Sequence, residues 1–460
     1  MPSSPSAVNA PNGRPSRYVA FDGGMLFIDM LPDPERLTLE NGLRLIIAKD
    51  PTAPVAATGF WTDAGVCDER TDRRGIAHFI EHMMFRGSEN VPSQEHARRI
   101  AQLGGDCNAF TSPDTTVYHE RVPSESIEEV FRLESDRLMR LRLADKEMQV
   151  ERKVILEELH AYENQPATRA MLAIQKEISA GHPYALSPLG RHEDLEAMEL
   201  ADLETFYRRC YRPDRVVAVV CGDVEVARVA DLAQKYFGDW RSPNERNEVG
   251  DPPDFKPALG RMSLRLSMEV PVVAQVYQLD PLQDIDRPAL ELLVALLSSG
   301  ASSPLREELV RKRRLCVEAA CSNMLGAQGG LLIFFGVFLP PGRHARRRTV
   351  MAEMIDRFVE QGPNPEQFDQ HLKQFRIEWA KDTYSHEDRV LGLGNAELLE
   401  GGFERYHHGL EELSKVTPPR VQDLARRIFA ADNRLELDIT PEQSRWWLVP
   451  IGLFMRFLAR

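Results

Sequence analysis

The chain has 460 residues with 57 basic and 70 acidic side chains, which gives a formal charge of −13. This length exceeds what one compact core accommodates, so at least two domains are expected. The acidic balance excludes a general nucleic-acid-binding protein, because neutralising phosphates requires a basic face, but it leaves room for a basic peptide substrate. The six cysteines form no C-x-x-C pair, which excludes a cysteine-rich zinc knuckle and indicates reduced thiols in a cytoplasmic protein.

The first 34 residues are expected to form a flexible lead and a first strand. The sequence up to about Ser16 is rich in Pro, Ser, Asn and Gly, and it lacks the basic start and the apolar stretch of a secretory signal. A first domain is expected at residues 35–240. Apolar patterning predicts strands at 37–39, 43–47 and 55–61, followed by a helix from about Arg74.

The second half repeats the order of the first. Residues 241–260 are polar and contain four prolines, which is typical of a linker. A second domain is expected at 261–440, with strands at 262–266 and 272–277 and a helix at 287–297. Each half also ends with a helix, a turn and a strand. The sequence therefore predicts an α+β fold of two homologous α/β-sandwich domains in tandem, each a mainly antiparallel sheet with helices packed on it.

Residues 441–460 form an apolar C-terminal tail that is rich in aromatic residues and contains arginines. The apolar run is shorter than the roughly 20 residues that span a bilayer. One interpretation is that the tail packs against the body of the protein or against a partner subunit. The other is an anchor in the membrane interface, where aromatic residues beside arginines are favourable.

A metal site is predicted in the helical segment 75–85. His78 and His82 are four residues apart, so both imidazoles project from one face of the helix and can bind one Zn²⁺. Glu81 lies on the same stripe and can act as a general base on water rather than as a ligand. The H-x-x-E-H pattern also occurs by chance in unrelated proteins. A third ligand from a separate element therefore decides between the two interpretations.

A second helix, predicted at 145–162, supplies candidate carboxylates. Glu151 and Glu158 are seven residues apart and share a face. Glu158 is the natural third ligand, which leaves an open fourth position, and Glu151 is expected near the water or its hydrogen-bond network. Glu157 is the competing ligand, but it points about 100° further around the helix. The alternative for these carboxylates is a salt-bridged surface helix.

These residues resemble the pitrilysin-type (M16) family of inverted-motif zinc metallopeptidases, which includes pitrilysin, the insulin-degrading enzyme and the mitochondrial processing peptidase. In that family, H-x-x-E-H is followed some seventy-five residues later by a helix with the pattern E-x₆-E. Here Glu158 follows His82 by 76 residues. The resemblance implies that His78, His82 and Glu158 bind one zinc ion, that Glu81 is the catalytic base and that Glu151 is an auxiliary acid.

The resemblance extends over residues 35–440 and is closest to short two-domain subunits such as those of the mitochondrial processing peptidase and bacterial heterodimeric relatives. Residues 104–118 look like the edge strand that lies beside the zinc ion in this family. Such a strand pairs with an extended substrate through its backbone. Asn108, Ala109 and Phe110 are therefore the expected substrate-binding residues.

One departure from the family pattern concerns an arginine and a tyrosine, seven residues apart, that help active members to bind the substrate and the oxyanion. Val310 and Val317 occupy the two places here, and no tyrosine lies between Tyr277 and Tyr384. An oxyanion donor contributes about 10² to 10³ in rate. The chain is therefore expected to work in a heterodimer, in which a second subunit of this family supplies the pair.

The expected function is that of a zinc-dependent metalloendopeptidase subunit, which hydrolyses peptides or unfolded segments inside a chamber in the cytoplasm. One alternative is a homodimeric processing peptidase, in which Arg311, Arg313 or Arg314 replaces the missing pair. The other alternative is a non-catalytic subunit of the family. The retained zinc-site residues argue against this last possibility.

Overall fold

The computed structural model describes residues 17–21, 24–28, 32–242, 254–268, 270–299, 303–338, 344–382 and 385–442. The lead up to Ser16, most of the expected linker and the apolar tail from residue 443 onward lie outside these ranges. Near the N-terminus, β1 (Arg17–Phe21) and β2 (Gly24–Ile28) pair as an antiparallel hairpin, where the sequence predicted a single strand.

A six-stranded sheet with the order β3-β4-β8-β5-β7-β6 forms the first half. Its strands are β3 (Glu35–Thr38), β4 (Arg44–Lys49), β5 (Val55–Thr62), β6 (Asp106–Thr111), β7 (Thr116–Pro123) and β8 (Val216–Gly222). Neighbouring strands are antiparallel except for the parallel pair β4 and β8. Every residue of β8 is buried, whereas β6 lies at the edge of the sheet beside β7.

A five-stranded sheet with the order β11-β12-β10-β13-β9 forms the second half. Its strands are β9 (Gly260–Leu266), β10 (Val272–Leu279), β11 (Cys316–Gly326), β12 (Gly329–Phe338) and β13 (Leu435–Pro441). The order β9-β13-β10-β12-β11 repeats β4-β8-β5-β7-β6, and the parallel pair β9–β13 matches β4–β8. The prediction of two similar, mainly antiparallel α+β halves is confirmed.

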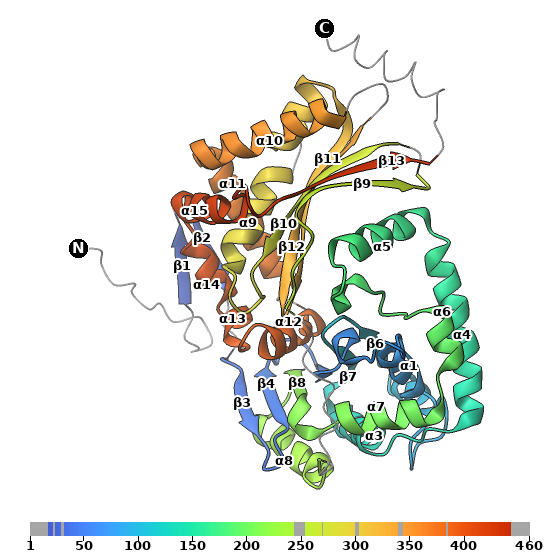
Figure 1. Cartoon of the computed structure of the whole chain (residues 1–460). Coiled ribbons are helices and arrows are strands. Elements are labelled where there is room, and N and C mark those ends of the chain that lie inside the picture. Colours follow the sequence, from blue (N-terminus) through green and yellow to red (C-terminus); the bar gives the residue numbers. More distant parts are fainter. Residues whose placement is uncertain are drawn as a thin grey trace.

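Helices pack against both sheets (Figure 1). Those of the first half are α1 (Ile76–Met83), α2 (Glu95–Gln102), α3 (Ile127–Met139), α4 (Asp145–Glu163), α5 (Pro166–Ile178), α6 (His192–Ala197), α7 (Leu200–Cys210) and α8 (Val226–Phe237). Those of the second half are α9 (Arg287–Ser298), α10 (His344–Gln361), α11 (Pro365–Asp382), α12 (His386–Leu399), α13 (Glu404–His407), α14 (Gly409–Ser414), α15 (Pro418–Ile428) and the π-helix η5 (Arg306–Lys312). Among the described helices, none has both the length and the apolar character needed to cross a bilayer.

Each sheet is covered on one face by its own helices and on the other face by the opposite half. Helix α12, from the second half, packs Val390 and Leu393 against Trp61 and its neighbours on the first sheet. In return, Ile178 and Tyr184 from the first half pack against the second sheet, on the face opposite α9, α10, α11 and α15 (Figure 1). The two halves are therefore joined through two apolar layers rather than by the linker alone.

Buried polar contacts reinforce this exchange. Asp50, at the end of β4, accepts a 2.8 Å hydrogen bond from Arg389 of α12 and lies 3.2 Å from His386 Nε2. The indole of Trp61 donates to Asn395 at 3.0 Å. Because these groups come from opposite halves, they fix the first sheet, and the site built on it, relative to the second half.

Candidate metal centre and active site

The helix that carries the H-x-x-E-H motif begins at a glycine with a left-handed backbone. Gly75 has a φ of +91°, and an added Cβ would lie 2.9 Å from the backbone of Leu189 and of Gly190. The buried carboxylate of Glu69 accepts hydrogen bonds from the N–H groups of Gly75 (3.0 Å) and Ala77 (3.1 Å). The N-cap residue of α1 is a glycine and offers no side-chain cap. Glu69 therefore satisfies two of the free N–H groups at the start of the helix.

Three predicted ligands converge between α1 and α4. The Oε2 atom of Glu158 lies 3.8 Å from His78 Nε2 and 3.5 Å from His82 Nε2, and the three donor atoms all lie within 4.8 Å of one another. Donors that bind zinc at about 2.0–2.2 Å in a tetrahedron are separated by about 3.3–3.6 Å. Glu157, the competing ligand, is exposed and is not part of this group.

Glu151 contacts His82 at Nδ1, the ring nitrogen that does not face Glu158. Its Oε2 lies 3.0 Å from His82 Nδ1, and its carboxylate also forms an ion pair with Arg86. A carboxylate at this position favours the tautomer with the proton on Nδ1, which leaves the Nε2 lone pair facing Glu158. The contacts of Glu151 are therefore those of a residue that orients a ligand. Its role as an auxiliary acid stays a prediction.

The two histidines differ in their electrostatic surroundings. Burial, with a smaller contribution from the charge of His82, lowers the pKa of His78 to about 3. Burial also opposes the charged form of His82, but the hydrogen bond with Glu151 and the charges of Glu81 and Glu158 outweigh it and raise the pKa of His82. Metal binding requires neutral imidazoles, so His78 is already in the required state at neutral pH. The two nitrogens and one carboxylate oxygen fit a catalytic zinc ion.

Glu81 is held from the edge strand. Thr111 Oγ1, at the end of β6, donates a 2.5 Å hydrogen bond to Glu81 Oε2. Burial raises the pKa of Glu81, although the bond from Thr111 acts in the opposite direction. A carboxylate with a raised pKa is a stronger general base than an exposed one. Thr111 lies in the edge strand predicted from the sequence, but no sequence pattern indicated its contact with Glu81.

The predicted substrate-binding residues lie on β6, but not on one face. Exposure alternates along the strand, so Asn108 and Phe110 point to the more exposed side, whereas Ala109 points with Thr111 to the half-buried side. Phe110 is 36% exposed. Because β6 is an edge strand, its outer backbone groups are available to an extended peptide.

A cavity of about 260 Å³ opens beside the base and the second histidine. It lies between α1, α2 and α4 and is lined by Glu81, His82, Phe85, Arg86, Gln94, Ala97 and Glu151. Its walls combine an aromatic ring with charged and amide groups. The cavity therefore offers space for a side chain next to the proposed catalytic groups.

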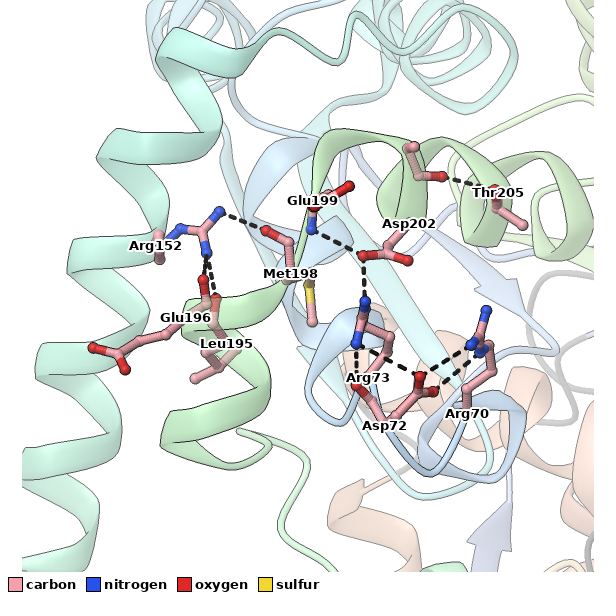
Figure 2. A network of polar contacts seen from close by, with 11 residues as sticks. Arg70, Asp72, Arg73, Arg152, Leu195, Glu196, Met198, Glu199, Asp202 and Thr205 are labelled. Atoms are coloured by element: carbon pink, nitrogen blue, oxygen red, sulfur yellow. Dashed lines mark hydrogen bonds and ion pairs between the residues drawn. The ribbon is translucent and has the colours of Figure 1, made fainter.

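Polar contacts shown in Figure 2 hold the two helices of the site in place. Arg152, next to Glu151 on α4, donates hydrogen bonds of 2.6–2.7 Å to the carbonyl groups of Leu195, Glu196 and Met198 at the end of α6. Arg73, just before α1, donates to Asp202 of α7 at 2.7 Å. A short connection joins α6 to α7. The contact of α4 with α6 and the contact of Arg73 with α7 therefore fix α4 relative to the start of α1.

Two family models match the chain. The one described as "Insulinase (Peptidase family M16)" matches residues 44–190, and the one described as "Peptidase M16 inactive domain" matches residues 197–375. The chain belongs to the M16 peptidase family. The predicted zinc ligands and the predicted catalytic base all lie within the first of these matches.

Relatives agree with this assignment. "Uncharacterized zinc protease ML0855" of Mycobacterium leprae is 28% identical over 404 residues, which cover 86% of this chain and 89% of that protein. The structure of a protease from Helicobacter pylori is similar over 89% of this chain and 100% of that chain, with 23% identity and a TM-score of 0.80. The periplasmic protease PqqL of Escherichia coli matches 92% of this chain but 50% of its own, with 18% identity and a TM-score of 0.74.

The zinc site is tested by exchanging two neighbouring glutamates of α4. We expect Glu158→Gln to reduce zinc affinity by more than the 10–100-fold that is typical when a residue supporting a metal ligand is lost, because an amide is a poor substitute for a carboxylate ligand. Glu157→Gln removes the same charge from an exposed neighbour and serves as the control. Zinc affinity is measured by competition with a chelator. Equal zinc affinities of the two variants would contradict the proposed site.

Proposed function

We propose that the chain is the zinc-holding subunit of a metalloendopeptidase that cleaves extended peptides or unfolded segments. The observation that carries this proposal is the convergence of His78, His82 and Glu158, with Glu81 held next to them by Thr111 from an open edge strand. Relatives named zinc proteases support the peptidase role. The combination of a His₂Glu donor set with a buried general base is typical of metal-assisted hydrolysis.

His78, His82 and Glu158 would hold the zinc ion, which supplies Lewis acidity that polarises a carbonyl group and acidifies water. Glu81 accepts a proton from the attacking water and later passes it to the leaving amine. Thr111 restrains the Oε2 atom of Glu81, and the proposed proton acceptor is the other carboxylate oxygen, Oε1. The buried surroundings that raise the pKa of Glu81 strengthen it as a base.

Strand β6 is the proposed substrate platform. Its outer edge can pair with an extended peptide, and backbone pairing depends little on the sequence of the substrate. In this arrangement Asn108 and Phe110 contact alternate substrate side chains, and the cavity next to Glu81 receives another side chain. A requirement for extended backbone favours peptides and unfolded segments over folded proteins.

A second subunit is part of the proposal. Val310 lies in η5 and is partly buried against the hydrophobic core between the second sheet and its own helices. Val317 is 47% exposed and lies at an irregularity of β11. Neither side chain can donate a hydrogen bond to an oxyanion. Arg311 and Arg313, which the sequence offered as substitutes, form ion pairs with Glu307 and Glu308 respectively.

The catalytic role of Glu81 is tested by Glu81→Gln, which keeps the size of the side chain but removes its basicity. We expect turnover of an unstructured peptide to fall by at least 10²-fold, while one zinc ion per chain is retained. The Glu157→Gln variant should cleave at the wild-type rate. Cleavage that survives Glu81→Gln would rule out the mechanism.

The partner requirement is tested by comparing the isolated chain with the same chain after addition of a second M16 subunit from the native host. We expect cleavage to rise by about 10² to 10³, the contribution of an oxyanion donor. Full activity of the isolated chain would instead favour a homodimeric processing peptidase. A chain that binds no zinc and stays inactive with every partner would favour a non-catalytic subunit.

A further inference from the structure

The turn that joins β6 to β7, residues 112–115, is packed against the segment that leads into the zinc-site helix. The carbonyl groups of Ser112 and Pro113 accept hydrogen bonds from the N–H groups of Val66 (3.4 Å) and Cys67 (2.9 Å). A Cβ added to Gly65 would lie 2.5 Å from both of these carbonyl oxygens. The turn is therefore in close contact with the chain just before α1, and Thr111 lies directly next to it.

The same turn is bound by the second half of the chain. Asp114 accepts hydrogen bonds from the hydroxyl of Tyr184 (2.9 Å) and from the N–H of Ala327 (3.1 Å), which lies at the tip of the β11–β12 hairpin. The N–H of Gln328, also at this tip, donates to the Tyr184 hydroxyl at 3.0 Å. Two backbone N–H groups of the second half therefore donate hydrogen bonds to Asp114 and Tyr184 of the first half.

The hairpin tip fits this pair closely. Tyr184 is 8% exposed, and a Cβ added to Gly326 would lie 2.4 Å from its hydroxyl oxygen. His182 supports the arrangement from behind, because its Nδ1 accepts from the N–H of Tyr184 at 3.1 Å and its Nε2 lies 3.0 Å from the side-chain oxygen of Gln328. Buried hydrogen bonds of this kind are costly to leave unmade.

We propose that Tyr184 and Asp114 are positioning residues of the peptidase site: they fasten the turn after β6 to the β11–β12 hairpin of the second half, and so hold Thr111 against Glu81. This inference rests on the proposed function. Strand β6 pairs with β7 on one side and must accept substrate on the other, so its end needs a separate support. A misplacement of about 1 Å in a catalytic group can cost about 10² in rate.

A contact that only joined the two halves would affect stability but not the base. A double-mutant cycle between Tyr184→Phe and Thr111→Val distinguishes the two possibilities. The quantity measured is kcat, for the zinc-loaded enzyme in whichever assembly gives wild-type turnover. We expect Tyr184→Phe to lower kcat about tenfold while zinc content stays unchanged. In the Thr111→Val background, where the bond to Glu81 is already missing, Tyr184→Phe should cause little further loss.

Two more variants make the test independent of one substitution. Gly326→Ala places a methyl group against the Tyr184 hydroxyl from the second half and should reproduce the loss of kcat. Tyr207→Phe is the matched control, because the Tyr207 hydroxyl also makes one hydrogen bond as donor and one as acceptor. It donates to the carbonyl of Leu138 (3.0 Å) and accepts from the N–H of Leu141 (3.1 Å), away from the turn. The control should keep the wild-type kcat.

Amide hydrogen exchange of the β6–β7 hairpin provides a readout that needs no activity. We expect exchange to become about tenfold faster in Tyr184→Phe and Gly326→Ala, and to stay unchanged in Tyr207→Phe. Unchanged exchange in the first two variants, or losses of kcat that simply multiply in the double-mutant cycle, would overturn the positioning role. Failure of the proposed function would show separately, as full cleavage by Glu81→Gln.

Discussion

The hydrogen bond between His82 and the buried carboxylate of Glu151 is the contact on which the candidate site depends. It joins α1 to α4, and therefore sets the distance between the two histidines on one helix and Glu158 on the other. It also selects the tautomer of His82 that presents Nε2 to a metal ion. Glu151 is 2% exposed, so removing its partners would leave an uncompensated charge in the interior.

The duplicated fold places this site in the first half only. Among the described residues, the two groups with the spacing of metal ligands both lie there: His78, His82 and Glu158, and a fully buried cluster of His96, Glu120 and Glu134. Arg137 lies 2.8 Å from Glu120 and 2.5 Å from Glu134, so a guanidinium already provides the counter-charge in the second cluster. Burial and the neighbouring Glu134 raise the pKa of Glu120. The second half contributes by packing instead, through α12 on the first sheet and through the β11–β12 hairpin at the turn after β6.

Sequence patterns predicted the parts of the site that depend on one element at a time. The spacing of four in α1 and of seven in α4 defined faces, and alternating residues defined the sheet strands, because these periods follow from backbone geometry. The bond from Thr111 to Glu81, the cap that Glu69 forms on α1 and the contact of Tyr184 with Gln328 join segments brought together by tertiary packing. Periodicity shows which face a side chain occupies but not which group lies opposite. The opposite orientation of Ala109 to Asn108 and Phe110, in contrast, follows from strand alternation and was available from the sequence.

Two imidazoles and one carboxylate, from two helices joined by Glu151, are expected to form a zinc site. Zinc X-ray absorption spectroscopy of the purified, zinc-loaded chain tests it most directly. We expect nitrogen and oxygen scatterers at about 2.0–2.2 Å, with the outer-shell pattern of two imidazoles and no sulfur. A sulfur shell at about 2.3 Å, or a single imidazole, would contradict it.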